Sequence, residues 1–118
     1  MPYLMVMQTF IETNTYLRAA KGTGMSEAEM FNVLTAVAEN PLIGDIMTGC
    51  GGARKFRFAK SGGGKSGGYR VVSYFAGDDV PAFLLTVFPK NAKTNLTKAE
   101  QNIFAAAVKR LRDSLKGD

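Results

Sequence analysis

Residues 54–88 read RKFRFAKSGGGKSGGYRVVSYFAGDDVPAFLLTVF, and this stretch decides the fold. It contains three segments with the alternation or the β-branched and aromatic content typical of strands: Lys55–Phe58, Tyr69–Ala76 and Pro81–Phe88. The short turn at residues 77–79 makes the last two segments an antiparallel hairpin. Tyr3–Thr9 alternates weakly and is either a short edge strand or the entry to a helix. We therefore expect a small antiparallel β-sheet of roughly three to four strands.

Helical patterns precede this stretch. The pattern from Phe10 to Ala20 favours a helix, with an apolar stripe that also includes Tyr16 and Leu17. Ser26 and Glu29 have the spacing of a capping box, which predicts the start of a second helix. Asn40-Pro41 ends that helix, whose expected apolar side chains are Met30, Phe31, Leu34 and Val37.

A further helix follows the strands. Thr97 and Glu100 form its capping box, and its last turns are basic, which suits the helix dipole. We expect it to bury Ile103, Phe104, Ala107, Val108, Leu111 and Leu115. The element order predicts an α+β fold in a single domain spanning residues 1–118, with two N-terminal helices, the sheet and a C-terminal helix. In this prediction the helices pack on one face of the sheet.

The charge is concentrated in one place. The net charge is +5, and residues 54–70 contain six Lys or Arg side chains and no acid. A local cluster of this kind favours a polyanionic partner such as nucleic acid. No apolar run approaches the length of a membrane span and the N-terminus lacks the pattern of a secretory signal, so we expect a cytoplasmic protein without a membrane partner.

Two common kinds of site are excluded by composition. The chain has no histidine and one cysteine, Cys50, so an ordinary zinc site or a Ser-His triad cannot be assembled. We expect no metal and no cofactor. Cys50 is interpreted as a buried or bystander thiol in a reducing compartment.

The glycine-rich segment between the first two strands allows three interpretations. Gly64-Lys65-Ser66 matches the end of a phosphate-binding P-loop, but Ala59 occupies the position of the first glycine and a strand follows instead of a helix. An interdomain linker is disfavoured because the flanking strands are too short to stand alone. We therefore expect an adaptable hairpin loop that carries Lys60 and Lys65.

Strand alternation predicts where the cations converge. Lys55 and Arg57 share one face of their strand, opposite Phe56 and Phe58. If Arg70 points the same way, three cations meet on rigid sheet. Lys90 and Lys93, which follow the third strand, extend this group if the hairpin register permits.

Several sequence blocks in this region resemble a known family. They are GG-x-RK-x-R-x-A at residues 51–59, GKSGG-x-RV at 64–71 and KN-x-K-x-x-L at 90–96, followed by the capped C-terminal helix. Together and in this order they resemble the RelE/HigB-type toxins of bacterial type II toxin–antitoxin systems, most closely the HigB-like branch. The resemblance covers residues 40–100 well, and the first 40 residues only by helix order.

The resemblance implies an mRNA interferase that inhibits translation by cutting messages on the ribosome. Such toxins are metal-independent endoribonucleases in which the ribose 2′-OH attacks the adjacent phosphate. The implied partners are the ribosome, mRNA and a cognate antitoxin, often with a helix-turn-helix region, so that operator DNA is contacted only through the antitoxin. An acidic antitoxin segment would cover the basic cluster, or it would bind the helical side.

The resemblance also assigns roles to residues. Lys55, Arg57, Arg70 and Lys90 match the family's catalytic positions. Because neighbouring cations disfavour the charged form of a lysine, Lys55 is the candidate general base. Arg70 is the candidate for holding the phosphate, and Lys90 or Arg57 for neutralising or protonating the leaving oxygen. The expected RNA or ribosome contacts are Arg54, Lys60, Lys65, Lys93, Phe88 and Tyr74; for Tyr74 the alternative is a core residue.

Two other function classes share these features. A ParE-like relative would have the same fold but would act on DNA gyrase by binding, for which a convergent basic cluster on strands is not needed. A non-catalytic nucleic-acid-binding protein would need only the basic surface. Substitution of Lys55 or Arg70 separates an enzyme from a simple polyanion-binding surface, because only an enzyme loses cleavage while it keeps binding.

Overall fold

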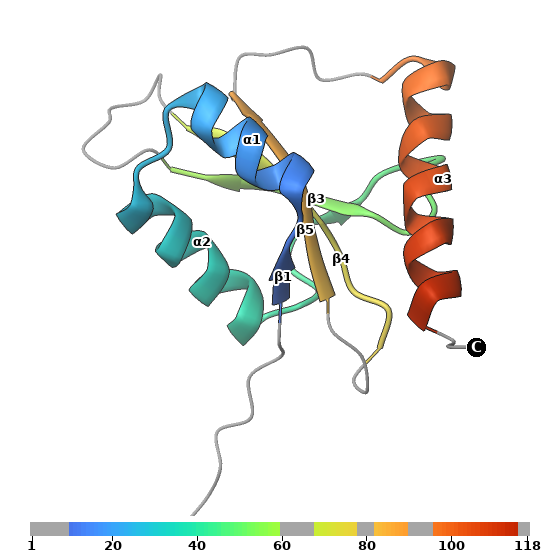
Figure 1. The fold of residues 1–118 in the computed structure, drawn as a ribbon, viewed down its shortest axis with the longest axis horizontal. Helices are drawn as coiled ribbons and strands as arrows, with labels where there is room; N and C mark the ends of the chain where they lie inside the picture. The colour runs from blue at the N-terminus through green and yellow to red at the C-terminus, as the bar shows by residue number, and fades with distance from the viewer. Residues whose placement is uncertain (1–9, 60–67, 78–81, 90–95, 116–118) are drawn as a thin grey trace, which may run out of the picture.

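The computed structural model describes residues 10–59, 68–77, 82–89 and 96–115 (Figure 1). These residues form a five-stranded sheet in the order β1-β5-β4-β3-β2, with three helices. The elements are β1 Phe10–Glu12, α1 Asn14–Thr23, α2 Glu27–Glu39, β2 Asp45–Ile46, β3 Arg54–Phe58, β4 Tyr69–Tyr74, β5 Ala82–Pro89 and α3 Lys98–Leu115. The α+β class is confirmed, and the sheet has more strands than expected. Within the described residues, no helix is long and apolar enough to cross a membrane.

The three predicted strands form the centre of the sheet. β3 pairs antiparallel with β4, and β4 pairs antiparallel with β5, so the predicted hairpin is confirmed. The β4–β5 register shifts once: Val72 lies opposite Thr86, whereas Ser73 lies opposite Leu84. Leu85 is therefore the extra residue of a β-bulge, which lets consecutive β5 side chains point to the same face.

The first helix starts later than expected, because an edge strand of the sheet precedes it. Phe10–Glu12 is not helical but forms β1, which pairs in parallel with β5, so the sheet is mixed. The helix begins only at Asn14 because Thr13 caps it, accepting a hydrogen bond from the Tyr16 amide at 3.1 Å. The Thr13 hydroxyl also donates to the Leu84 carbonyl at 2.8 Å, which fixes the helix to β5. The weakly alternating Tyr3–Thr9 lies outside the described residues.

The other edge of the sheet is β2, for which the sequence shows no strand pattern. Its two residues, Asp45 and Ile46, pair with Lys55 and Arg54 of β3. Gly44 makes this approach possible: it has φ +92°, and a Cβ there would collide with the carbonyl of Lys55. A strand this short carries no readable alternation, which is why the sequence does not predict it.

The helices cover both faces of the sheet, so the expectation that they pack on one face is wrong. α1 and α2 lie on one side in Figure 1 and α3 on the other. The core is correspondingly divided in two. The first cluster joins Tyr16 of α1 and Val33 of α2 to β3, β4 and β5, and the second joins Val108 of α3 to β4, β5 and residues 47–53. We call these two sides the α1/α2 face and the α3 face.

On the α1/α2 face, α2 has its predicted boundaries. The Ser26–Glu29 capping box is present and the helix ends at Glu39, one residue before Asn40. Its buried face differs in part from the prediction: Val33 and Val37 are fully buried, whereas Phe31 is 67% exposed. Phe31 follows Met30 directly, and two consecutive residues lie about 100° apart around a helix, so only one of them faces the core.

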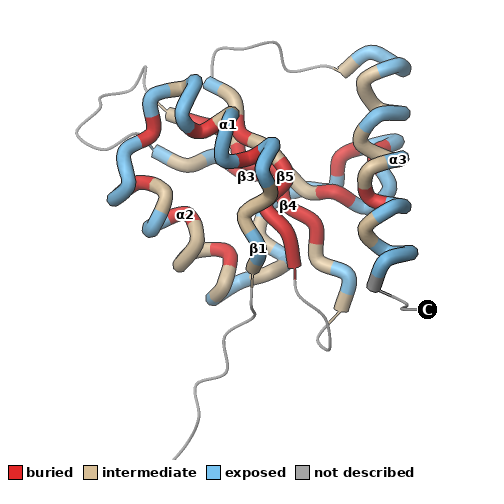
Figure 2. Tube along the Cα trace, viewed as in Figure 1, coloured by how far each residue is buried: buried red, intermediate tan, exposed pale blue. Residues whose placement is uncertain are grey.

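On the α3 face, the Thr97–Glu100 capping box is also confirmed by its two hydrogen bonds. Val108 is fully buried, and Phe104 and Leu111 are half-buried, but Ile103 is 68% exposed and is not a core residue. The helix approaches the loop before β3 closely at Gly51, whose φ is +74°. A Cβ there would lie 3.3 Å from the Cα of Ala105. Figure 2 shows the buried residues concentrated in the central strands and on the helix sides turned toward them.

Candidate nucleic-acid interface

The strands sort the predicted site residues by face. In β3, Phe56 and Phe58 pack into the core of the α1/α2 face, so Lys55 and Arg57 point to the α3 face. In β4, Tyr69 and Val71 belong to the same core as Phe56, and Arg70 therefore points to the α3 face as well. The three cations share one face, as the alternation predicts.

The register brings two of these cations and an aromatic ring into one row. Arg57 lies directly opposite Arg70, and Arg70 lies directly opposite Phe88 on β5. We call Arg57, Arg70 and Phe88 the arginine row. Directly opposed side chains on one face of a sheet have Cβ atoms about 4.5–5.5 Å apart, so the two arginine side chains leave the sheet as close neighbours. Like charges in this arrangement destabilise a sheet, and an anion bound between them would offset that cost.

Lys55 lies in the next row on the same face. It is opposite Val72, which is opposite Thr86, so it is diagonal to Arg70 and two residues before Arg57. Lys55 and Arg70 are half-buried, and Arg57 is exposed. Their stems are therefore fixed by the sheet while their charged ends reach solvent, a suitable arrangement for gripping a phosphate.

One acidic residue in this region was missed. Asp45 of β2 is the direct partner of Lys55 and shares its face. Only cations were counted around Lys55, because no strand was predicted at Asp45. The strand pairing that places this carboxylate beside Lys55 depends on Gly44, ten residues before Arg54 in the chain.

Two of the predicted RNA contacts are placed elsewhere. Arg54 has the same strand parity as Phe56 and points to the α1/α2 face, where its guanidinium donates to the carbonyls of Leu42 at 3.2 Å and Gly44 at 3.1 Å. Tyr74 is on the α3 face but is only 5% exposed, packed in the core beside α3. Neither side chain is presented to RNA in this structure. Arg54 holds the turn before β2, and Tyr74 is a core residue.

The remaining predicted site residues, the catalytic candidate Lys90 among them, fall outside the described residues. These are Lys60 and Lys65 of the glycine-rich segment and Lys90 and Lys93 after β5. Their attachment points are nevertheless defined, because β3 ends at Phe58, β4 begins at Tyr69 and β5 ends at Pro89. All three strand ends lie at the arginine-row end of the sheet, since Phe58, Tyr69 and Pro89 are paired with one another.

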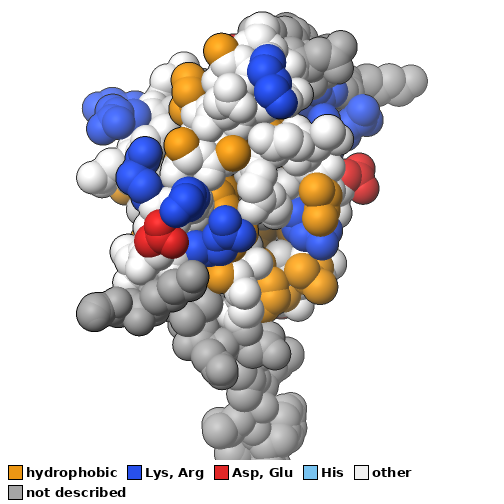
Figure 3. Space-filling view, turned by 90° about the vertical axis from the view of Figure 1, so that its right-hand side faces the viewer, with side chains coloured by type: hydrophobic (Ala, Val, Ile, Leu, Met, Phe, Trp, Pro, Cys, Tyr) orange, Lys and Arg blue, Asp and Glu red, His pale blue; other side chains and the backbone are white. Residues whose placement is uncertain are grey.

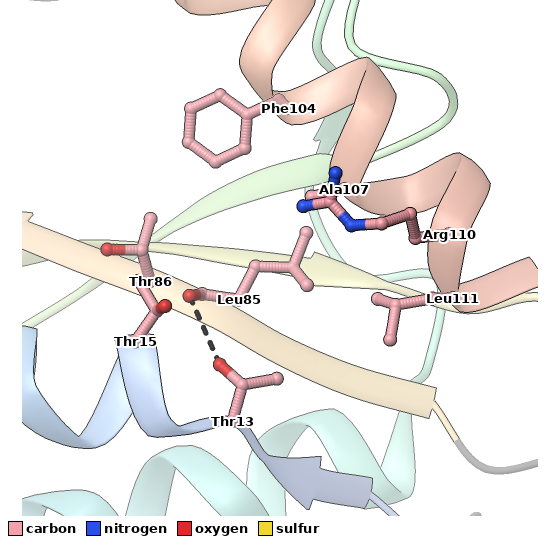
Figure 4. Close-up of a pocket in the computed structure, with 8 residues that line it drawn as sticks. All are labelled: Thr13, Thr15, Leu85, Thr86, Phe104, Ala107, Arg110 and Leu111. Atoms are coloured by element: carbon pink, nitrogen blue, oxygen red, sulfur yellow. Dashed lines mark hydrogen bonds between the residues drawn. The ribbon is translucent and has the colours of Figure 1, made fainter. Parts of the chain in front are cut away.

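A pocket adjoins the arginine row on the α3 face. Its volume is about 330 Å³, and it lies between the start of α1, the β5 bulge and α3. Figure 4 shows its lining residues: Thr13, Thr15, Leu85, Thr86, Phe104, Ala107, Arg110 and Leu111. The bulge accounts for the pocket floor, because it directs both Leu85 and Thr86 toward α3. Thr86 is two residues before Phe88, so the pocket and the arginine row are contiguous.

The outer surface of α3 adds further basic groups. Arg110 lines the pocket, and Lys109 forms an exposed ion pair with Asp113 at 2.9 Å. Figure 3 shows this side of the molecule, on which lysine and arginine side chains lie among hydrophobic ones. An exposed pair like Lys109–Asp113 contributes little to stability, about 0.3–0.5 kcal/mol. The face is thus predominantly basic as well as partly apolar.

The cysteine has no catalytic setting. Cys50 is fully buried, as expected, and burial raises the pKa of its thiol, an effect that the nearby charge of Lys55 partly opposes. A buried, protonated thiol is a poor nucleophile. Among the residues that the structure describes, no group of three or more acidic or cysteine side chains is placed to hold a metal ion.

Comparison with known proteins identifies the family. The family model described as the RelE toxin of the RelE/RelB toxin–antitoxin system matches residues 7–116. The chain therefore belongs to the RelE toxin family, and it is a toxin of the toxin–antitoxin type.

A solved structure of this family has the same fold. The free state of a double arginine-to-alanine mutant of the E. coli toxin RelE matches with a TM-score of 0.56 at 21% sequence identity. The match covers 88% of this chain and 97% of the other. At this level of identity the similarity concerns the fold, which agrees with the arrangement of sheet and helices described above.

Proposed function

We propose that this toxin is an mRNA endoribonuclease that acts on the translating ribosome and thereby inhibits translation. The observation that carries the proposal is the arginine row with Lys55 beside it, a convergent set of cations held by paired strands of a RelE-family fold. The resemblance of the sequence blocks to HigB-like toxins supports the same branch of the family. A simple gyrase-binding surface would not need cations fixed on adjacent strands.

The proposed reaction needs no metal. The ribose 2′-oxygen forms a bond to the adjacent phosphorus, the bond from phosphorus to the 5′-oxygen breaks, and the products carry a 2′,3′-cyclic phosphate and a 5′-hydroxyl. Lys55 is the general base that accepts the proton of the 2′-hydroxyl. Arg70 donates two parallel hydrogen bonds to the phosphate oxygens, on which negative charge accumulates in the transition state.

The leaving oxygen needs a second cation. Arg57, opposite Arg70, neutralises the charge on the departing 5′-oxygen, which takes a proton from water to become the 5′-hydroxyl. Lys90, one residue after the end of β5, is the alternative donor. Phe88 completes the arginine row and supplies a face on which a base of the message can stack, a contact worth about 1–3 kcal/mol in single-strand recognition.

The partners follow from the same proposal. Lys60, Lys65 and Lys93 contact RNA or ribosomal RNA, and the cytoplasm is the compartment in which these partners occur. The antitoxin carries a helix-turn-helix region and links the complex to operator DNA. Exposure of Arg57 on a predominantly basic face favours an acidic antitoxin segment that covers the arginine row over one that binds the α1/α2 side.

The test is to map cleavage on a defined message. Purified protein is mixed with translating ribosomes and 5′ ends are located by primer extension, for the wild type, Lys55→Ala and Arg70→Ala, with a ribosome-free control. We expect cuts that require ribosomes and disappear in both variants. Arg18→Ala, which removes an exposed arginine on α1, is the matched control and should cut as the wild type does.

Two outcomes would redirect the assignment. Intact message in every lane, with the protein still bound to ribosomes in a pelleting assay, would indicate a non-catalytic nucleic-acid-binding protein. Intact message without ribosome binding would favour the ParE-like alternative, which a gyrase supercoiling assay would then test.

A further inference from the structure

A buried polar link connects α2 to the first residue of β4. The hydroxyl of Tyr69 donates a hydrogen bond to Oε1 of Glu29 at 3.1 Å, across 40 residues of sequence. Both side chains are buried, with Tyr69 3% and Glu29 4% exposed. A buried carboxylate is costly unless it is hydrogen-bonded, so this contact is a constrained feature of the fold.

The acceptor is itself held in place. The same Glu29 oxygen accepts the backbone N–H of Ser26 at 2.9 Å, and the Glu29 N–H donates to the Ser26 hydroxyl at 3.0 Å. The backbone N–H of Ser26, which any residue at this position keeps, therefore helps to hold the carboxylate that receives Tyr69. Burial, together with the hydrogen bond to Glu29 and its charge, raises the pKa of Tyr69, so its hydroxyl stays protonated and remains a donor.

The link lies at the end of β4 that adjoins the arginine row. Tyr69 is in the last row of the β3–β4–β5 ladder, opposite Phe58 and Pro89. Pro89 has no N–H to donate to that row, and the preceding Gly68 has no side chain to brace the strand. Strand ends open most readily, so a side-chain anchor at this position has the greatest effect on the residue that follows.

The geometry points to Tyr69 and Glu29 as positioning residues for Arg70. Tyr69 reaches into the α1/α2 face while Arg70, the next residue, points to the α3 face, so fixing the ring fixes the backbone from which the guanidinium projects. This inference rests on the proposed function for its catalytic consequence, because Arg70 is there the group that holds the phosphate. Small misplacements of a transition-state contact have large effects on rate.

The experiment compares Tyr69→Phe with Ser26→Ala. Tyr69→Phe keeps the ring and removes the hydroxyl; Ser26→Ala weakens the same helix cap but leaves the Tyr69–Glu29 bond. Single-turnover cleavage is measured over a range of ribosome concentrations. We expect the saturating rate of Tyr69→Phe to fall about tenfold with an unchanged half-saturating concentration, and Ser26→Ala to stay within about twofold of the wild type. Equal rates in the two variants would overturn the inference.

A second measurement does not depend on cleavage. Amide hydrogen exchange at Arg70 and Val71 is recorded by NMR for the wild type and both variants. Exchange about tenfold faster in Tyr69→Phe than in Ser26→Ala supports the anchor, and equal exchange overturns it. If the wild type does not cleave RNA at all, the proposed function fails, and the exchange data alone decide whether Tyr69 positions Arg70.

Discussion

The two faces of the sheet differ in how they are filled. On the α1/α2 face, Tyr16, Val33, Val37 and Leu84 are completely buried and form one continuous core with two helices. On the α3 face the helix packs mainly through half-buried side chains, and a pocket of about 330 Å³ remains between it and β5. The cations Lys55, Arg57 and Arg70 all lie on this second face.

This difference indicates that one face of the sheet stabilises the fold and the other carries the candidate site. Alternation in β3 and β4 sends aromatic and aliphatic side chains to one side and basic ones to the other, so the face that stabilises the fold also fixes the backbone beneath the site. Mutually repelling cations are tolerated because the opposite face supplies the packing energy. Variants on the two faces should therefore separate activity from stability.

The largest expected effect is on activity. Arg70→Ala should lower the cleavage rate about 10²–10³-fold, because removing one donor to a developing oxyanion has costs of this size. Its free energy of unfolding should equal or slightly exceed that of the wild type, since repulsion from Arg57 is removed. Rates on ribosomes and urea unfolding curves measure the two quantities, and a large loss of stability would contradict the separation.

The next effect is on stability, and it sharpens the contrast between the cores. Leu84→Ala should lower the free energy of unfolding by about 3 kcal/mol, as expected for a completely buried leucine. Leu111→Ala, which truncates a half-buried leucine of α3, should lower it by less than half as much. Urea unfolding compares the two variants. Similar losses would show that the α3 face is packed as firmly as the other.

A smaller difference is expected between the helix caps. Thr13 caps α1 and also donates to β5, so Thr13→Ala should cost about 2 kcal/mol. Thr97 caps α3 only locally, and Thr97→Ala should cost about 0.5–1 kcal/mol. Thermal unfolding of both variants measures the two losses of stability. A larger loss from Thr97→Ala would contradict the expectation that the Thr13 cap contributes more than the Thr97 cap.

The smallest effect concerns Tyr16. Burial, followed by the charge of Glu12, raises the pKa of its hydroxyl, which has no hydrogen-bond partner among the described residues. Because the pKa is higher in the folded state, the contribution to stability is complete below the unfolded pKa of about 10 and is lost as the pH rises through the folded value. Tyr16→Phe should change stability by less than about 1 kcal/mol at pH 7 and should flatten its decline above pH 10. Urea unfolding of the wild type and of Tyr16→Phe from pH 7 to 11 tests this. If both proteins lost stability equally above pH 10, Tyr16 would not be responsible for the decline.

Much of the central fold could be predicted from local chemistry. The capping boxes at Ser26 and Thr97 mark helix starts because their hydrogen bonds depend on neighbours three residues away. The faces of Lys55 and Arg57 follow from strand parity alone. The same parity assigns Arg54 to the opposite face, so its placement was readable, although its basic charge favoured the RNA interpretation.

The remaining features depend on contacts distant in sequence. β1 and β2 are too short to show periodicity. They are strands because β1 pairs with β5 and β2 pairs with β3. An apolar helical stripe shows that a helix is buried but not which face of the sheet it covers, so the position of α3 was not accessible. The Tyr69–Glu29 bond joins residues 40 positions apart and has no local signal.

The most direct test of the central claim is the single-turnover rate of message cleavage on ribosomes for Arg70→Ala beside Arg18→Ala. The two variants remove the same charge from opposite sides of the sheet. We predict that Arg70→Ala loses at least about 100-fold while Arg18→Ala cuts at the wild-type rate. Equal rates for the two variants would contradict the assignment of the α3 face as the site of RNA cleavage.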